Sequence, residues 1–180
     1  MWNSQVIIML LEGIRDTLYM TLASTLFGYI IGLPMGIVLT VTDKDGIRPN
    51  AAVYKVLDVI SNLLRSIPFI ILLIVLIPFT RFVVGRSYGS TATIVPLTIA
   101  AAPYIARMVE SSLKEVDAGV IEAARSMGAS DFQIVTKVML VEARTSLIVG
   151  ATISLGTILG YSACLLYTSP SPRDRQNLVC

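Results

Sequence analysis

The chain has 180 residues, of which 54% are hydrophobic and 14% charged, and its formal net charge is only +2. The apolar residues cluster in long uncharged runs, which indicates a lipid bilayer as the solvent. There is no histidine, which excludes Ser-His and Cys-His catalysis and most zinc sites. No basic patch interleaved with aromatic residues points to nucleic acid. The two cysteines, Cys164 and Cys180, form no Cys-x-x-Cys pair. We therefore expect no catalytic residues, metal or cofactor.

The first apolar element, residues 17–42, contains no charged residue. It is long enough to cross a hydrocarbon core of about 30 Å as a helix. Gly28, Gly32 and Gly36 recur every four residues and share one helical face, which would let another helix approach closely. Glycine is also common in membrane helices in general, so both interpretations stay open. Pro34 is expected to bend this helix.

Three further apolar segments follow along the chain, at about residues 54–80, 88–106 and 145–163. A polar, turn-rich loop at 43–50 separates the first two elements. Each segment is long enough for one membrane-spanning helix. The sequence therefore predicts an all-α polytopic membrane protein with four spans.

Lysine and arginine in the loops set the orientation of such a protein, because cytoplasmic loops carry the excess. Because successive spans cross the membrane in opposite directions, the first loop and the long polar region at about 107–144 lie on the same side. Together they hold most of the basic loop residues: Lys44, Arg48, Lys55, Arg107, Lys114, Arg125, Lys137 and Arg144. The intervening break has only Arg81 and Arg86. We expect both regions in the cytoplasm and the N-terminus outside.

Within the long polar region, apolar residues recur at helical spacing, which predicts one helical face. These residues are Leu113, Val116, Val120, Ala124 and Met127. Amphipathic surface helices of this kind are common, so the spacing by itself also fits an idle connection.

Capping signals divide this polar region into a helix, a turn and a second helix. Asp117 can cap the first helix, and Gly128 stands where a left-handed glycine would end it. Ser130 and Gln133 form a capping-box pattern before the next apolar run. The sequence predicts a helix–turn–helix element on the cytoplasmic side.

The stretch EAARSMGAS, followed by Val138 and Leu140, resembles the EAA loop of ABC-importer permeases. Val141 stands where that family usually has proline. The resemblance implies a coupling helix that docks on a separate ATPase subunit. The implied coupling residues are Glu122, Ala123, Ala124, Arg125, Met127, Gly128 and Ala129. The chain has no Gly-x-x-x-x-Gly-Lys phosphate loop of its own, so it is not expected to be an enzyme by itself.

Outside this loop, the segments LRSIPFIILLIVLIPFTR, IVPLTIAAAPYIARMVE and LGYSA resemble the methionine-importer permeases within the same type I family. The resemblance places Arg65 and Pro68 beside the translocation path. Tyr161 and Ser162 are further candidates for the path lining. Each also fits a plainer interpretation, in which Arg65 extends its charge to the membrane interface and Tyr161 and Ser162 only pack between helices.

The implied assembly contains two copies of this chain, an ABC ATPase subunit dimer and an extracytoplasmic substrate-binding lipoprotein. It is expected in the bacterial inner membrane, in contact with membrane lipid. The implied function is ATP-driven import of D- or L-methionine. Import of another amino acid is the alternative, and a membrane scaffold without transport activity is a remoter one. A membrane-embedded enzyme has little support, because no span carries clustered carboxylates and there is no Gly-x-Ser-x-Gly motif.

We assign residues 1–163 to the transmembrane domain, four spans of an expected five, including the coupling region at about 107–144. The resemblance stops after Ala163. Residues 164–180, rich in serine, proline and charge, are expected to be loop or disordered. They resemble translated sequencing-adapter sequence rather than a natural tail.

Overall fold

The computed structural model describes residues 4–85 and 89–168, and every regular element in these ranges is helical. The elements are α1 (Ser4–Thr42), α2 (Ala51–Ser66), α3 (Phe69–Val84), α4 (Ser90–Lys114), α5 (Ala118–Ser126), α6 (Asp131–Gln133), the π-helical segment η1 (Ile134–Met139), α7 (Leu140–Glu142) and α8 (Arg144–Thr168).

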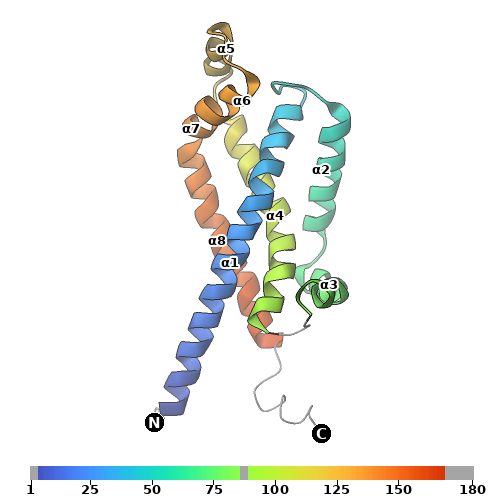
Figure 1. Cartoon of the computed structure of the whole chain (residues 1–180), viewed down its shortest axis with the longest axis vertical. Coiled ribbons are helices and arrows are strands. Elements are labelled where there is room, and N and C mark those ends of the chain that lie inside the picture. Colours follow the sequence, from blue (N-terminus) through green and yellow to red (C-terminus); the bar gives the residue numbers. More distant parts are fainter. Residues whose placement is uncertain (1–3, 86–88, 169–180) are drawn as a thin grey trace.

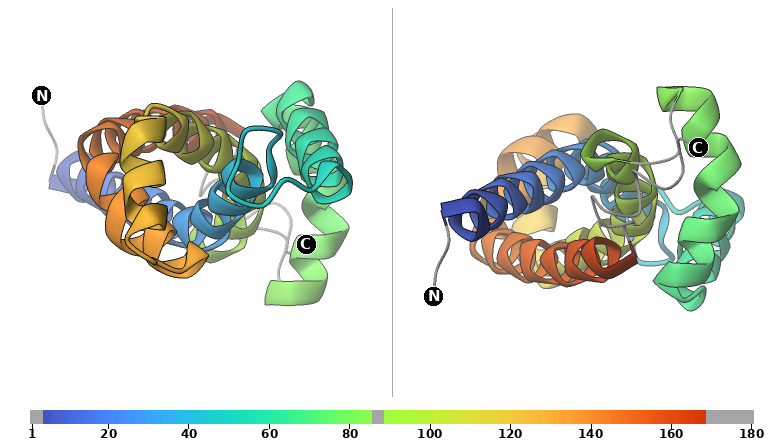
Figure 2. Two further views of the ribbon diagram at one scale, coloured as in Figure 1. Left: turned by 90° about the horizontal axis from the view of Figure 1, so that it is seen from above. Right: turned by 90° about the horizontal axis from the view of Figure 1, so that it is seen from below.

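Helices α1, α4 and α8 run along the long axis of the molecule (Figure 1). Seen from either end, α2 and α3 flank this group on one side (Figure 2). The short helices α5 to α7 lie at the end opposite the N-terminus (Figure 1). In the described part of the chain, three helices are long and apolar enough to cross a membrane, or four spans if α2 and α3 count as one. The all-α polytopic fold is therefore confirmed.

The glycine face of α1 packs directly on α4, which favours the first of the two interpretations of its spacing. A Cβ atom built on Gly32 would lie 2.7 Å from the carbonyl oxygen of Ala102. One built on Gly36 would lie 2.6 Å from that of Ala106. Side chains cannot fit at these points, so the glycines let the two backbones approach closely. Pro34 lies inside α1, which continues past it without interruption.

The apolar segment predicted as one span at 54–80 is not one continuous helix. The segment forms two helices, α2 and α3, which meet at an angle of 108°. Ile67 is extended (φ −79°, ψ 124°), and Pro68 follows it at the start of α3. A proline disfavours helical geometry in the residue before it and supplies no backbone N–H. The chain therefore turns at Ile67–Pro68.

The boundary between the third span and the polar region also differs from the prediction. Helix α4 continues past Ala106 to Lys114, so the first two turns of the expected cytoplasmic region belong to the spanning helix. Only four residues further on, α5 starts at Ala118. The predicted single face at 113–127 was therefore wrong: Leu113 is buried, whereas Val120 and Met127 are exposed. Helical phase is lost where the chain turns between the two helices.

Helix α8 continues to Thr168, five residues beyond the expected end of the fourth span. The prediction that residues 164–168 are loop or disordered was wrong. Their sequence, CLLYT, extends the apolar run of α8. The rest of the proposed tail, residues 169–180, lies outside the described residues.

Candidate coupling site

Helix α5 begins and ends with local signals that its sequence carries. The Asp117 carboxylate accepts a hydrogen bond from the backbone N–H of Gly119 at 2.6 Å. At the other end, Gly128 has φ +82°, a left-handed conformation that side chains disfavour. The backbone N–H of Ala129 donates to the carbonyl of Ala124 at 3.1 Å. These bonds fix a sharp turn after α5.

A second helical arm follows the turn and runs through α6, η1 and α7. Ser130 and Gln133 form the predicted capping box: the Ser130 hydroxyl accepts from the Gln133 N–H, and the Gln133 side chain accepts from the Ser130 N–H at 3.0 Å. Val141, at the family's usual proline position, lies in α7 with its side chain exposed. We call residues 117–142 the elbow. The capped helix–turn–helix is confirmed.

The predicted coupling residues lie together on the first arm and the turn of the elbow. Ala124 is buried in the same apolar cluster as Ile134 and Met139 of the second arm. Ala129 is half-buried. The other five are exposed and available to a partner: Glu122, Ala123, Arg125, Met127 and Gly128.

Two large apolar side chains flank the turn and point into solvent. Met127 is 82% exposed and Phe132 is 76% exposed. Sequence reasoning named Met127 but missed Phe132. The signal available was a phenylalanine two residues after a helix cap, in a region otherwise polar. Exposed apolar residues at the end of a molecule are typical of protein-binding surfaces.

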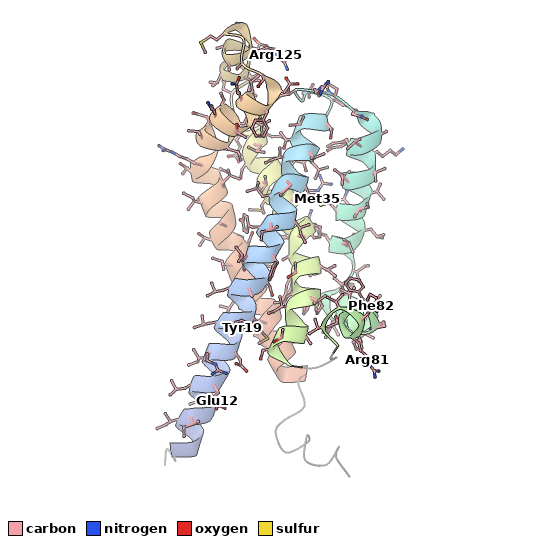
Figure 3. The ribbon with its side chains drawn as sticks, in the orientation of Figure 1. Glu12, Tyr19, Met35, Arg81, Phe82 and Arg125 are labelled. Carbon is pink, nitrogen blue, oxygen red and sulfur yellow. The ribbon has the colours of Figure 1, made fainter. Side chains whose placement is uncertain are left out.

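The elbow is tied to the loop between α1 and α2. Arg125, which lies at the far end of the molecule in Figure 3, donates to the carbonyl oxygen of Ile47 at 3.2 Å. Its guanidinium also lies 4.0 Å from the Asp131 carboxylate, and Arg48 of the loop lies 3.7 Å from the same group. Arg125 thus makes contacts inside the chain.

A cavity of about 520 Å³ lies between this loop, the end of α4 and α5. Charged side chains of both signs line it: Asp43, Asp45, Lys114, Glu122 and Arg125. Two of the predicted coupling residues, Glu122 and Arg125, therefore face the same space as the loop.

Sequence reasoning also missed a group of paired charges below this cavity. The Lys114 ammonium lies 2.6 Å from Asp43 and 2.8 Å from Glu110. Arg107 pairs with Glu110 at 2.6 Å and with Asp58 of α2. The hydrogen bond from Lys114 holds the pKa of the Asp43 carboxyl below its usual range, because it favours the ionised form.

The four candidate path residues lie in two separate places. Arg65 and Pro68 are exposed near the α2–α3 break. Tyr161 of α8 stacks on Phe69, with ring centroids 4.7 Å apart, so it reaches the same break. Ser162 is buried and accepts a hydrogen bond from Thr21 of α1 at 3.4 Å. Ser162 therefore packs between α1 and α8.

Residues 12–173 match the protein family described as binding-protein-dependent transport system inner membrane component. The chain is 54% identical over 155 residues to the D-methionine transport system permease protein MetI of Salmonella typhimurium, and equally to that of Escherichia coli. Each match covers 86% of this chain and 71% of the relative.

Solved structures agree with this relationship. An inward-facing structure of the MetNI methionine ABC transporter matches with a TM-score of 0.88 and 52% identity, over 91% of this chain and 76% of that chain. An amino acid ABC transporter matches with a TM-score of 0.62 at 22% identity, over 93% of this chain and 77% of that one, and shares the fold alone. The chain belongs to the family of inner-membrane components of binding-protein-dependent transport systems.

Proposed function

We propose that this chain is the membrane-spanning permease subunit of an ATP-driven importer of methionine, in its D or L form. Two copies form the translocation pathway in the bacterial inner membrane, each with its N-terminus outside. A dimer of a separate ABC ATPase subunit hydrolyses ATP, so the chain itself is not an enzyme. An extracytoplasmic binding lipoprotein delivers the substrate. The methionine assignment is supported by the names of relatives that are 54% identical.

The elbow is the observation that carries the coupling role. Its two arms are capped at Asp117 and Ser130 and joined by a left-handed glycine, so the turn has a defined shape. Met127 and Phe132 project from it into solvent. A capped turn with two exposed apolar side chains, bordered by the exposed charges of Glu122 and Arg125, suits insertion into an apolar groove of a partner.

In this proposal, closure of the ATPase dimer pushes on the elbow, and the spans change from an inward-open to an outward-open arrangement. The elbow joins α4 to α8, the two helices that share the long axis with α1 (Figure 1). A displacement of the elbow therefore acts directly on both spanning helices. The exposed residues at the α2–α3 break, Arg65 and Pro68, with Tyr161 nearby, are proposed to lie beside the path.

The coupling role is tested by co-purification with the ATPase subunit of a methionine importer. We expect Glu122→Arg and Phe132→Ser each to reduce the amount of bound ATPase by about tenfold, because binding energy concentrates in a few exposed anchors. Glu115→Arg is the matched control, since Glu115 is an exposed carboxylate at the end of α4, outside the elbow. Undiminished binding by the first two variants would rule out this docking surface.

The substrate is tested by uptake of radiolabelled L-methionine in vesicles that contain the chain with the ATPase and the binding lipoprotein. Excess unlabelled D-methionine is expected to compete with the label, whereas histidine is not. Competition by histidine alone would assign the chain to another amino acid. Stable ATPase binding without stimulation by any amino acid would support a scaffold without transport activity.

A further inference from the structure

Glu110 is a buried carboxylate at the centre of a charge network that crosses three segments of the chain. Its side chain is 5% exposed. One carboxylate oxygen accepts from Lys114 at 2.8 Å and from the Tyr54 hydroxyl at 3.3 Å. The other accepts from Arg107 at 2.6 Å. A buried carboxylate is stable only when it is paired in this way.

Arg107 carries the network from α4 to α2. One guanidinium nitrogen binds Glu110, and another donates to the Asp58 carboxylate and to the Asn62 side-chain oxygen. Asn62 in turn donates to Asp58 at 3.2 Å. Since the planar guanidinium holds its donors in a fixed fork, Arg107 sets the position of α2 relative to α4.

Lys114 carries the network to the loop between α1 and α2. Its ammonium joins Glu110 to Asp43 and lies 5.8 Å from the centre of the Tyr54 ring. The same loop is held to the elbow, because Arg125 donates to the carbonyl of Ile47. Polar contacts therefore connect the elbow to the loop, the loop to α4, and α4 to α2.

We propose that Glu110 is a positioning residue that transmits displacement of the elbow to α2, and thereby to the α2–α3 break. This inference rests on the proposed coupling function. In this charge network, α5 and its turn make no polar contact with α2. The loop between α1 and α2 and the Glu110 side chain therefore connect the elbow to α2. Ser61 is the buried residue of α2, and the polar contacts of α2 with α4 in this network are the Arg107–Asp58 ion pair and the hydrogen bonds of Tyr54 and Asn62.

Glu110 acts through its partners and not on the substrate. Loss of its charge should leave the elbow and its ATPase contact in place, since α5 and its turn are held by their own caps. The expected defect is a lower amount of substrate transported for each ATP hydrolysed. A residue needed only for folding would instead reduce ATPase binding, ATP hydrolysis and transport together.

The first experiment measures methionine uptake and ATP hydrolysis by the reconstituted transporter. Glu110→Gln is expected to lower the ratio of transport to hydrolysis about 2- to 30-fold, the range for residues that carry coupling. Asp58→Asn is expected to act in the same direction. The double variant should be no worse than the stronger single one, because both changes act through Arg107. Glu115→Gln changes an exposed carboxylate at the end of α4, outside the elbow; it is the matched control and should not alter the ratio.

A second experiment does not depend on transport. Spin labels are attached at Val59→Cys on α2 and Ser111→Cys on α4, both exposed positions, after both native cysteines are changed to serine. The distance distribution is expected to be narrow with Glu110 and clearly broader with Glu110→Gln. An unchanged distribution, or an unchanged transport-to-hydrolysis ratio, would overturn the inference. A wild-type chain with a narrow distribution but no ATP-dependent transport would instead contradict the proposed function.

Discussion

Gly36 of α1 lies so close to Ala106 of α4 that a Cβ atom built on the glycine would be 2.6 Å from the Ala106 carbonyl oxygen. The same Cβ would lie 2.7 Å from the Cβ of Val109. The first contact is with backbone, which cannot move aside as a flexible side chain can. The distance between α1 and α4 at this level is therefore set by the absence of a side chain at residue 36.

Gly36→Ala should separate α1 from α4 and reduce stability by about 1–3 kcal/mol, the usual cost of overpacking. Thermal unfolding in detergent would measure the loss. Gly13→Ala on the same helix is the control, because its Cβ would meet nothing within 4 Å and alanine favours helix. Equal unfolding temperatures for the two variants would contradict this account of the glycine face.

Gly128 should tolerate asparagine better than valine. Its φ of +82° costs a side-chain-bearing residue about 1–3 kcal/mol, and asparagine is among the residues that accept this conformation most readily. A Cβ at residue 128 would meet nothing within 4 Å, so backbone strain, and not crowding, separates the two variants. Co-purified ATPase is expected to fall more with Gly128→Val than with Gly128→Asn. The reverse order would argue against a left-handed turn.

Ser130→Ala should weaken the start of the second arm by about 1 kcal/mol, through loss of the helix cap. Hydrogen exchange of the Gln133 amide, which donates to the Ser130 hydroxyl, is expected to become faster. Ser126→Ala provides the comparison, because the Ser126 hydroxyl donates within its own helix to the carbonyl of Glu122 and caps nothing. Equal exchange at Gln133 in both variants would mean that the capping box does not hold this end.

Stability should fall in acid through Asp43. Its folded pKa is lowered, chiefly by the hydrogen bond from Lys114. The stabilisation from the ionised Asp43 is therefore fully present above the ordinary carboxyl pKa of about 4, and it is lost as the pH falls through the lower pKa of the folded state. Unfolding temperatures measured between neutral pH and the acid range should show the loss. Asp43→Asn should have a flatter profile there, and profiles that coincide would exclude this contribution.

The sequence by itself determined the features whose causes are local. The caps at Asp117 and Ser130 and the left-handed turn at Gly128 depend on bonds between residues a few positions apart. The spacing of Gly28, Gly32 and Gly36 is also local, so it indicated one candidate face for close helix packing, although it decided neither that the face is used nor which helix occupies it. Long uncharged runs gave the all-α membrane fold for the same reason.

Only the tertiary structure decided which distant residues meet. Arg107 lies 49 residues from Asp58, and Lys114 pairs with Asp43 across the first loop. Such pairs depend on the relative rotation and height of packed helices, which no local pattern specifies. The predicted single helical face at 113–127 was wrong for the same reason. A turn separates α4 from α5, and each helix takes its orientation from its own packing. The chain's residues thus fix each helix and cap locally, while burial of the apolar faces decides that Glu110 lies between Arg107, Lys114 and Tyr54.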